Sequence, residues 1–268
     1  MNIDRNKLNE LIKRPLLPAA ANELRRCGNV FFVGGELPVA ETLMTMFESF
    51  CTESTDLFHL SIGALNLFPG SEEMARQIKK NFHVRLMGRL DNPAPARVLE
   101  RIYAAGVDIL DIPLFIFDHS AALKRDCDRL ARYDALLSAR NVFPAWSAAS
   151  TLLAGEESPE STMKGIEALL DDGIVPLVAL AETAADVAPD ILAAIFAHLA
   201  AGWKEYHVPV QPFLPIINFM TPLTPKEPSG AFRGMIDRFH DRRRLAASDL
   251  RRRLRLKIVE DSMDSAAL

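Results

Sequence analysis

Short apolar runs, rich in β-branched and aromatic residues, alternate along the chain with longer segments in which apolar residues recur at helical spacing. This alternation is typical of βα units that build a parallel sheet. The pattern predicts strands at Asn29–Val33, Leu57–Ile62, His83–Leu86, Ile109–Phe117, Trp146–Leu153 and Ile174–Leu180. It predicts helices between them at Pro38–Phe50, Ser71–Phe82, Ala94–Ala105, Ala121–Ala139 and Ser161–Leu170.

Two glycines support this division into units. Gly106 and Gly173 each stand between a predicted helix and the strand that follows it. Glycine adopts the left-handed backbone conformation that commonly ends a helix, so the repeated placement indicates two helix C-termini. A strand, a helix and a parallel strand connect with a right-handed turn, and successive units therefore curl the sheet. The sequence predicts an α/β protein with a partial or closed (β/α) TIM-type barrel of about six βα units.

The segments on either side of the barrel have a different character. Two N-terminal stretches, Asp4–Arg14 and Pro18–Arg26, have a helical pattern and could cap the bottom of the barrel. After a helix at Ala188–Glu205, the stretch 209–228 is rich in proline, which opposes a helix and favours an extended chain along the open side of the barrel. A basic helix is expected at Ala231–Val259. The predicted division is an N-terminal helical cap (1–28), a barrel (29–208) and a covering segment with the basic helix (209–268).

Composition restricts the class of protein. The chain has 268 residues, 49% of them hydrophobic, and a formal net charge of -4, which argues against a nucleic-acid-binding protein as a whole. Its three cysteines, Cys27, Cys51 and Cys127, are scattered and fit a reducing compartment. Neither a signal peptide nor a transmembrane segment is apparent, so we expect a cytoplasmic protein.

In a parallel barrel, reacting groups follow the carboxyl ends of strands. Arg89 and Asp91 leave the third predicted strand together, and Arg89 could bind a substrate carboxylate or simply pair with Asp91. Asp118 and His119 follow the fourth strand and could act as acid, base or metal ligand, although Asp-His-Ser is also a good start for a helix. Ser61 is a further candidate for contact with a ligand, with simple turn chemistry as the alternative.

The stretch from Phe143 to Glu182 resembles strand five, helix five and strand six of the radical-SAM superfamily, in its biotin synthase, ThiH and NifB branch. The resemblance covers about residues 29–185. It implies a barrel that binds S-adenosylmethionine and a [4Fe-4S] cluster held by a Cys-x-x-x-Cys-x-x-Cys loop. That loop is absent from this sequence. We therefore expect no cluster bound by the chain's own cysteines, with an upstream segment carrying the loop as a further alternative.

The same resemblance implies ligand-binding residues. Gly34, Gly35 and Glu36 resemble the Gly-Gly-Glu element that meets the methionine part of S-adenosylmethionine, although a tight turn with a carboxylate at a helix N-terminus explains them too. Gly155 matches one glycine of the element that lines the adenine, and Glu157 begins the run into helix five. Ser158 and Pro159 form a helix start. Glu182, after the last predicted strand, is one more candidate that could face inward.

The last segment is strongly basic. Leu250, Leu254 and Ile258 recur at four-residue spacing among arginines, which predicts an amphipathic basic helix. It could pack on the protein's own acidic surface, on an acidic partner or on anionic lipid, whereas nucleic acid is disfavoured because aromatic residues for stacking are lacking.

Two functions follow from the sequence. In the first, the chain is a cluster-less radical-SAM-like barrel that binds a small polar or anionic molecule, as an accessory subunit that partners a cluster-bearing enzyme through the arginine-rich helix. In the second, it is an enzyme that uses carboxylate and histidine acid–base chemistry on such a molecule.

Overall fold

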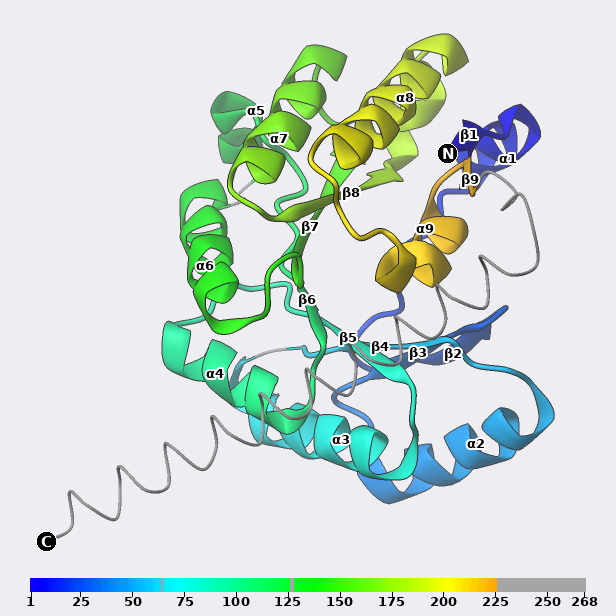
Figure 1. Cartoon of the computed structure of the whole chain (residues 1–268), viewed down its shortest axis with the longest axis vertical. Coiled ribbons are helices and arrows are strands. Elements are labelled where there is room, and N and C mark those ends of the chain that lie inside the picture. The colour runs from blue at the N-terminus through cyan, green and yellow to red at the C-terminus, as the bar shows by residue number, and fades with distance from the viewer. Residues whose placement is uncertain (64, 126–127, 226–268) are drawn as a thin grey trace, which may run out of the picture.

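The structure is a computed structural model, described here for residues 1–63, 65–125 and 128–225. Its main feature is a curled, seven-stranded sheet in the order β2-β3-β4-β5-β6-β7-β8 (Figure 1). Strands β3 to β8 run parallel, and β2 pairs antiparallel with β3 at one edge. The sheet thus forms a half-barrel, which agrees with the predicted α/β class and partial TIM-type barrel.

The strands are β2 (Leu24–Cys27), β3 (Val30–Gly34), β4 (Leu57–Ser61), β5 (Arg85–Arg89), β6 (Ile109–Asp111), β7 (Ala148–Ala154) and β8 (Val175–Leu180). The helices are α1 (Arg5–Lys13), α2 (Val39–Thr52), α3 (Phe68–Asn81), α4 (Ala96–Ala105), α5 (His119–Lys124), α6 (Arg129–Val142), α7 (Pro159–Asp171), α8 (Pro189–Glu205) and α9 (Leu214–Met220). Short 3-10 turns lie at η1 (Leu65–Leu67), η2 (Glu182–Asp186) and η3 (Gln211–Phe213), and a second small sheet joins β1 (Asn2–Ile3) to β9 (Leu223–Thr224).

Helices α2, α3, α4, α6, α7 and α8 cover the convex side of the sheet (Figure 1). Aromatic rings fill part of that layer, where Phe58 of β4 packs on Phe82, with ring centroids 4.9 Å apart, and on Phe50 of α2. Side chains alternate between the two faces of a strand, so His59 and Ser61 are placed near or on the opposite, concave face. On that face the ring of Phe32 lies 5.2 Å from His59 and 4.7 Å from Phe219 of α9.

The open side of the half-barrel is occupied by α9, which contacts both β3 and β8 (Figure 1). The proline-rich stretch does reach the open side, but the expectation that it is non-helical was wrong for residues 211–220. Pro212 and Pro215 stand in the first turns of η3 and α9, where a missing N–H is tolerated. Residues 226–268, with the predicted basic helix, lie outside the described residues.

Several helix ends confirm the sequence analysis. Gly106 caps α4 with a φ of 117°, and Gly173 follows α7 with a φ of 69°. Ser158 caps α7, accepting a hydrogen bond from the backbone N–H of Ser161, with Pro159 in the first turn. The predicted helix Ala121–Ala139 is instead two helices, α5 and α6, because Asp128 caps a new start at Arg129.

Two other predictions differ from the structure. The strand expected at Ile109–Phe117 ends at Asp111, because Pro113 has no N–H to continue the ladder and Phe115 adopts a φ of 62°. Its continuation is a single bridge from Phe115 to Leu152. His83, expected inside a strand, precedes β5 and is exposed.

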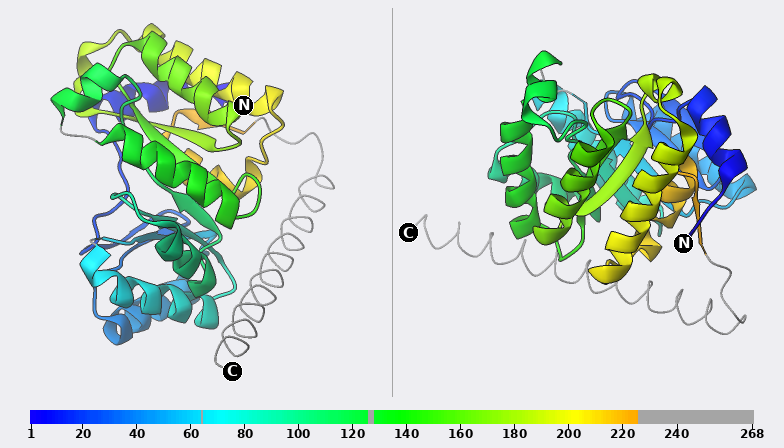
Figure 2. Two further views of the ribbon diagram at one scale, coloured as in Figure 1. Left: turned by 90° about the vertical axis from the view of Figure 1, so that its left-hand side faces the viewer. Right: turned by 90° about the horizontal axis from the view of Figure 1, so that it is seen from above.

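The second N-terminal helix, expected at Pro18–Arg26, is not formed. Residues Leu24–Cys27 instead pair with β3 as strand β2, and they alternate between partly buried and exposed positions, as a strand does. The preceding helix α1 lies beside α8 and the small sheet of β1 and β9 (Figure 2).

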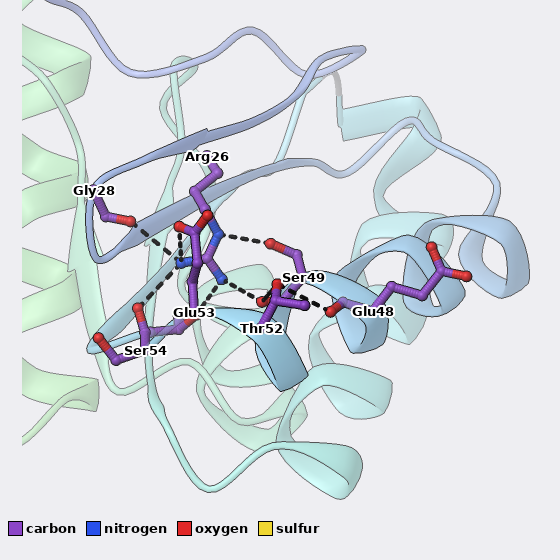
Figure 3. Close-up of polar contacts among 8 residues, drawn as sticks. Arg26, Gly28, Glu48, Ser49, Thr52, Glu53 and Ser54 are labelled. Carbon is purple, nitrogen blue, oxygen red and sulfur yellow. Dashed lines mark hydrogen bonds and ion pairs between the residues drawn. The ribbon is translucent and has the colours of Figure 1, made fainter.

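Arg26 fastens the antiparallel edge strand to the end of α2 (Figure 3). Its guanidinium donates hydrogen bonds to Ser49, to Thr55 and to the carbonyl oxygens of Gly28 and Ser54. It also pairs with Glu53, at 3.7 Å. A single mostly buried side chain thus joins β2, the β2–β3 turn and the loop before β4.

We predict that Arg26→Gln lowers the free energy of unfolding by about 2 kcal/mol, because several acceptors then lose their donor. Urea denaturation followed by circular dichroism would measure this. Arg97→Gln, at an exposed position on α4, is the control and should change stability by less than about 0.5 kcal/mol. Equal effects of the two substitutions would contradict the assigned role of Arg26.

Candidate functional site

One row of paired positions crosses the parallel strands near their carboxyl ends. Cα partners run in register from Gly34 through Ser61, Arg89 and Asp111 to Ala149. Positions that pair directly across parallel strands share a face of the sheet. Arg89 and Asp111, the last residues of β5 and β6, are therefore direct neighbours, with Ser61 on the other side of Arg89.

Asp111 is a buried carboxylate with one free oxygen. Its Oδ2 atom accepts a hydrogen bond of 2.9 Å from the hydroxyl of Thr151 on β7, whereas Oδ1 has no hydrogen-bond partner. Burial raises the pKa of Asp111 to about 6, although the nearby positive charge of Arg89 and the Thr151 bond act in the opposite direction. A carboxyl group with this pKa can exchange a proton near neutral pH.

Arg89 is held on one side and unpartnered on the other. Its Nε atom donates to Asp91 at 2.8 Å, and its guanidinium lies 5.5 Å from the centre of the Phe115 ring. The buried Nη1 atom has no partner. The predicted pairing of Arg89 with Asp91 is therefore present, yet it leaves one edge of the guanidinium available.

His59 lies on β4, two residues before Ser61 and therefore on the same face of the strand. Its side chain is fully buried, and neither ring nitrogen has a hydrogen-bond partner. Burial, together with the charge of Arg89, lowers the pKa of His59 to about 3. The imidazole is therefore neutral at physiological pH and offers one donor and one acceptor.

We call His59, Arg89, Asp111 and Thr151 the interior polar cluster. Of these four, the sequence analysis singled out only Arg89. Asp111 lay inside a strand predicted to run on to Phe117, and His59 lay inside the strand predicted at Leu57–Ile62. The usable signal was an ionisable side chain inside an otherwise apolar parallel strand, where both faces are buried.

The Gly34-Gly35-Glu36 element lies beneath the N-terminal segment. The backbone N–H groups of Gly34 and Glu36 donate to the carbonyl oxygens of Glu23 and Ala21, and that of Gly35 donates to Ser61. The Ser61 hydroxyl donates to the carbonyl oxygen of Ala19. The structure thus places this element and Ser61 in contacts within the chain, and a role in ligand binding stays a prediction.

Asp118 and His119 stand at the start of α5. Asp118 accepts hydrogen bonds from the Ser120 hydroxyl and the Ala121 N–H, which lower its pKa, and His119 is exposed. This is the helix-start alternative raised by the sequence. Neither residue is brought into the interior polar cluster by a contact of the described residues.

The contacts of Glu157, Gly155 and Glu182 are likewise with residues other than those of the interior polar cluster. Glu157 accepts hydrogen bonds from the backbone N–H groups of Phe117 and Asp118, and burial raises its pKa. Gly155 has a φ of 101°, and a Cβ there would lie 2.7 Å from the Cα of Ala184. Glu182 is exposed at the start of η2. Glu157 and Gly155 thus shape the loops after β6 and β7.

The described residues do not fit a [4Fe-4S] cluster at the carboxyl ends of the strands. Cys27 ends β2 opposite the first residue of β3, and Cys51 lies in the last turn of α2, so both belong to the other end of the sheet. Cys127 lies outside the described residues. Within the described ranges, no three His, Cys, Asp or Glu side chains gather as a metal site would require.

No protein-family model matches the chain, and no curated protein matches it. Among solved structures, the chain is similar to methylornithine synthase (PylB) over 75% of this chain and 74% of that one, with 10% sequence identity and a TM-score of 0.49. This likeness is distant, and it assigns no ligand or activity to the chain. None of the helices in the described ranges has the length and apolar character needed to cross a bilayer.

We predict that Gly34→Ala lowers the free energy of unfolding by about 2 kcal/mol or more, because a Cβ there would lie 2.2 Å from the carbonyl oxygen of Ala21. Gly70→Ala is the matched control, since its Cβ would meet no atom closer than 3.7 Å and alanine favours the helix by up to about 1 kcal/mol. Chemical denaturation measures both. Wild-type stability of Gly34→Ala would show that residues 19–23 do not lie against this strand end.

We also predict that Asp111→Asn stabilises the protein at pH 8 and not at pH 4. The folded-state pKa of Asp111 is above its ordinary value, so the stability that the protonated group supports is present at low pH and is lost as pH rises through about 6. The gain at pH 8 should be on the order of 2 kcal/mol. Urea denaturation at both pH values measures it.

Asp118→Asn is the control, because it is expected to lower the stability at pH 8 rather than raise it. Because the pKa of Asp118 is lowered, its contribution is present at high pH and is lost as pH falls. A gain for Asp111→Asn that is the same at pH 4 and pH 8 would rule out titration of Asp111 as its cause.

Proposed function

We propose that this protein binds a small polar molecule on the concave face of its sheet, at the carboxyl ends of β4, β5 and β6. The observation that carries the proposal is a set of buried polar atoms without partners on three adjacent strands: both ring nitrogens of His59, Nη1 of Arg89 and Oδ1 of Asp111. Among the described residues they form the largest such group on neighbouring strands.

The energetic argument is direct. A buried polar atom without a hydrogen-bond partner costs about 1–3 kcal/mol, and more if the group is charged. Buried polar groups in folded proteins are overwhelmingly paired, so a local group of exceptions indicates that their partners come from elsewhere. A bound molecule with its own donors and acceptors supplies such partners for all three side chains at once.

The position of the cluster supports the same function. Binding sites of (β/α) barrels lie at the carboxyl ends of the strands, and Arg89 and Asp111 end β5 and β6. The proposed site uses residues at the strand ends themselves, in contrast to the loop and helix-start residues singled out from the sequence, Asp118, His119, Gly155, Glu157 and Glu182.

A second function, acid–base catalysis at this site, is favoured by one observation. The pKa of Asp111, about 6, suits proton transfer near neutral pH, and neutral His59 can donate or accept a hydrogen bond. In this alternative Asp111 and His59 take the roles that the sequence suggested for Asp118 and His119. Chemical conversion of the bound molecule, followed by mass spectrometry, separates it from binding alone.

S-adenosylmethionine and a protein partner remain proposals from the sequence. The resemblance implies S-adenosylmethionine, so it belongs among the molecules to test, with no radical step because clustered thiolates are lacking in the sequence. Partnership with a cluster-bearing enzyme through the arginine-rich segment is tested by co-purification with and without residues 233–268.

We predict that a thermal-shift screen of small polar molecules finds at least one that stabilises the wild-type protein, by about 2.7 kcal/mol at 100 times its Kd. The shift should disappear in Arg89→Gln and in Asp111→Asn, and persist in Asp134→Asn, an exposed carboxylate on α6. Circular dichroism checks that each variant is folded. A stabilising ligand that binds the two cluster variants as tightly as the wild type would place the site elsewhere.

A further inference from the structure

We infer that the molecule bound at the interior polar cluster is a zwitterion, with an ammonium group that donates to Asp111 and a carboxylate that accepts from Arg89. The inference rests on the function proposed above and narrows its ligand class. It replaces the broader expectation of a small polar or anionic ligand, and it follows from the charges and free edges of the cluster.

The charges of the cluster disfavour a simple anion. The positive charge of Arg89 is already paired with Asp91, whose side chain is 46% exposed, at 2.8 Å. Asp111, the register partner of Arg89, adds a carboxylate whose hydrogen-bond donor is a neutral hydroxyl. His59 is neutral. An anion bound to Arg89 alone would therefore stand beside a second, unbalanced carboxylate, whereas a cationic group there is stabilised.

The free edges of the two side chains are fixed by their existing contacts. Thr151 holds Oδ2 of Asp111, so Oδ1 is the oxygen that remains to accept a hydrogen bond. Asp91 holds Nε of Arg89, so Nη1 is the donor that remains. One unpartnered acceptor and one unpartnered donor are thus presented side by side, each on a charged group.

The spacing fits the head group of an amino acid. Neighbouring strands lie about 4.8 Å apart, so Arg89 and Asp111 leave adjacent backbone positions on one face, and the positive charge of Arg89 acts on the Asp111 carboxyl group. The ammonium and carboxylate of an α-amino acid are attached to one carbon atom and can contact both. Charge-assisted hydrogen bonds of this kind are stronger than those between neutral groups.

The surroundings of His59 fit the rest of such a molecule. The rings of Phe32 and Phe219 lie on one side of the concave face, and Met87, the register partner of His59, is fully buried beside it. An apolar or weakly polar side chain could lie against these groups. His59 would then accept or donate one hydrogen bond to a polar atom of that side chain.

The experiment uses the full chain and a panel of L-α-amino acids, tested by thermal shift and then by isothermal titration calorimetry. For each amino acid that binds, two half-ligands are tested: the amine that lacks the carboxylate and the carboxylic acid that lacks the amine. We expect each half-ligand to bind roughly 10- to 100-fold more weakly than the amino acid, because each loses one charged partner.

The variants test the assignment of each half. Asp111→Asn should lower the affinity for the amino acid by at least about tenfold and leave the affinity for the carboxylic acid little changed. Arg89→Gln should also lower the affinity for the amino acid, but it should leave the affinity for the amine little changed. Thr151→Val is a milder variant that frees Oδ2 of Asp111 and is expected to reduce affinity less. Asp134→Asn is the control, with wild-type affinity expected.

Two outcomes separate this inference from the proposed function. If a plain carboxylic acid binds as tightly as its amino acid, the zwitterion is wrong although the site stands. The same holds if only a plain anion, such as inorganic phosphate, binds and loses affinity in Arg89→Gln. If no tested molecule binds in a manner that depends on Arg89 or Asp111, both the inference and the proposed function fail.

Discussion

The burial of opposite charges on the concave face of the sheet is the constraint on which this structure depends. Arg89 and Asp111 end neighbouring strands in register, yet each makes its close contact with another residue, Asp91 or Thr151. Ionised groups away from water are costly unless they are paired and hydrogen-bonded. The free-energy cost of burying these charges is confined to one row of the sheet, and the packing of the apolar interior must offset it.

The way in which the half-barrel is closed keeps this row away from water. Helix α9 contacts both β3 and β8 on the open side, and the N-terminal segment crosses the ends of β3 and β4 through hydrogen bonds from Gly34, Glu36 and Ser61. These two parts of the chain are distant in sequence. Together they lie where further strands would complete a closed barrel, and His59 is fully buried.

The sequence could predict the elements of the fold better than the site, for a physical reason. Helix ends carry local chemistry, such as Ser158 before Pro159 or Gly106 after α4, and these were predicted correctly. A parallel strand covered on both faces has no alternation of polar and apolar residues, so the facing of each residue cannot be read from it. The site depends on that facing, and on a register that only the folded sheet reveals.

The same limits explain the other differences. The sequence showed that prolines disrupt helices, but it could not show that Pro212 and Pro215 fall in first turns, where they are harmless. The Asp118–His119 pair looked chemically rich, yet its position at the start of α5 uses the carboxylate as a cap. Local motifs such as these indicate where helices begin and end, whereas the interior polar cluster takes one residue from each of the four strands β4 to β7.

If the protein binds a molecule as proposed, the raised pKa of Asp111 links its stability to that binding. Burial raises the pKa of this carboxyl group to about 6, so its ionised form is destabilised in the folded protein. A cation that reaches Oδ1 relieves that destabilisation, so part of the free energy of binding comes from the folded protein rather than from the new contact alone. The cost of burying this charge in the free protein is then the source of selectivity, because a molecule without a positive group cannot recover it.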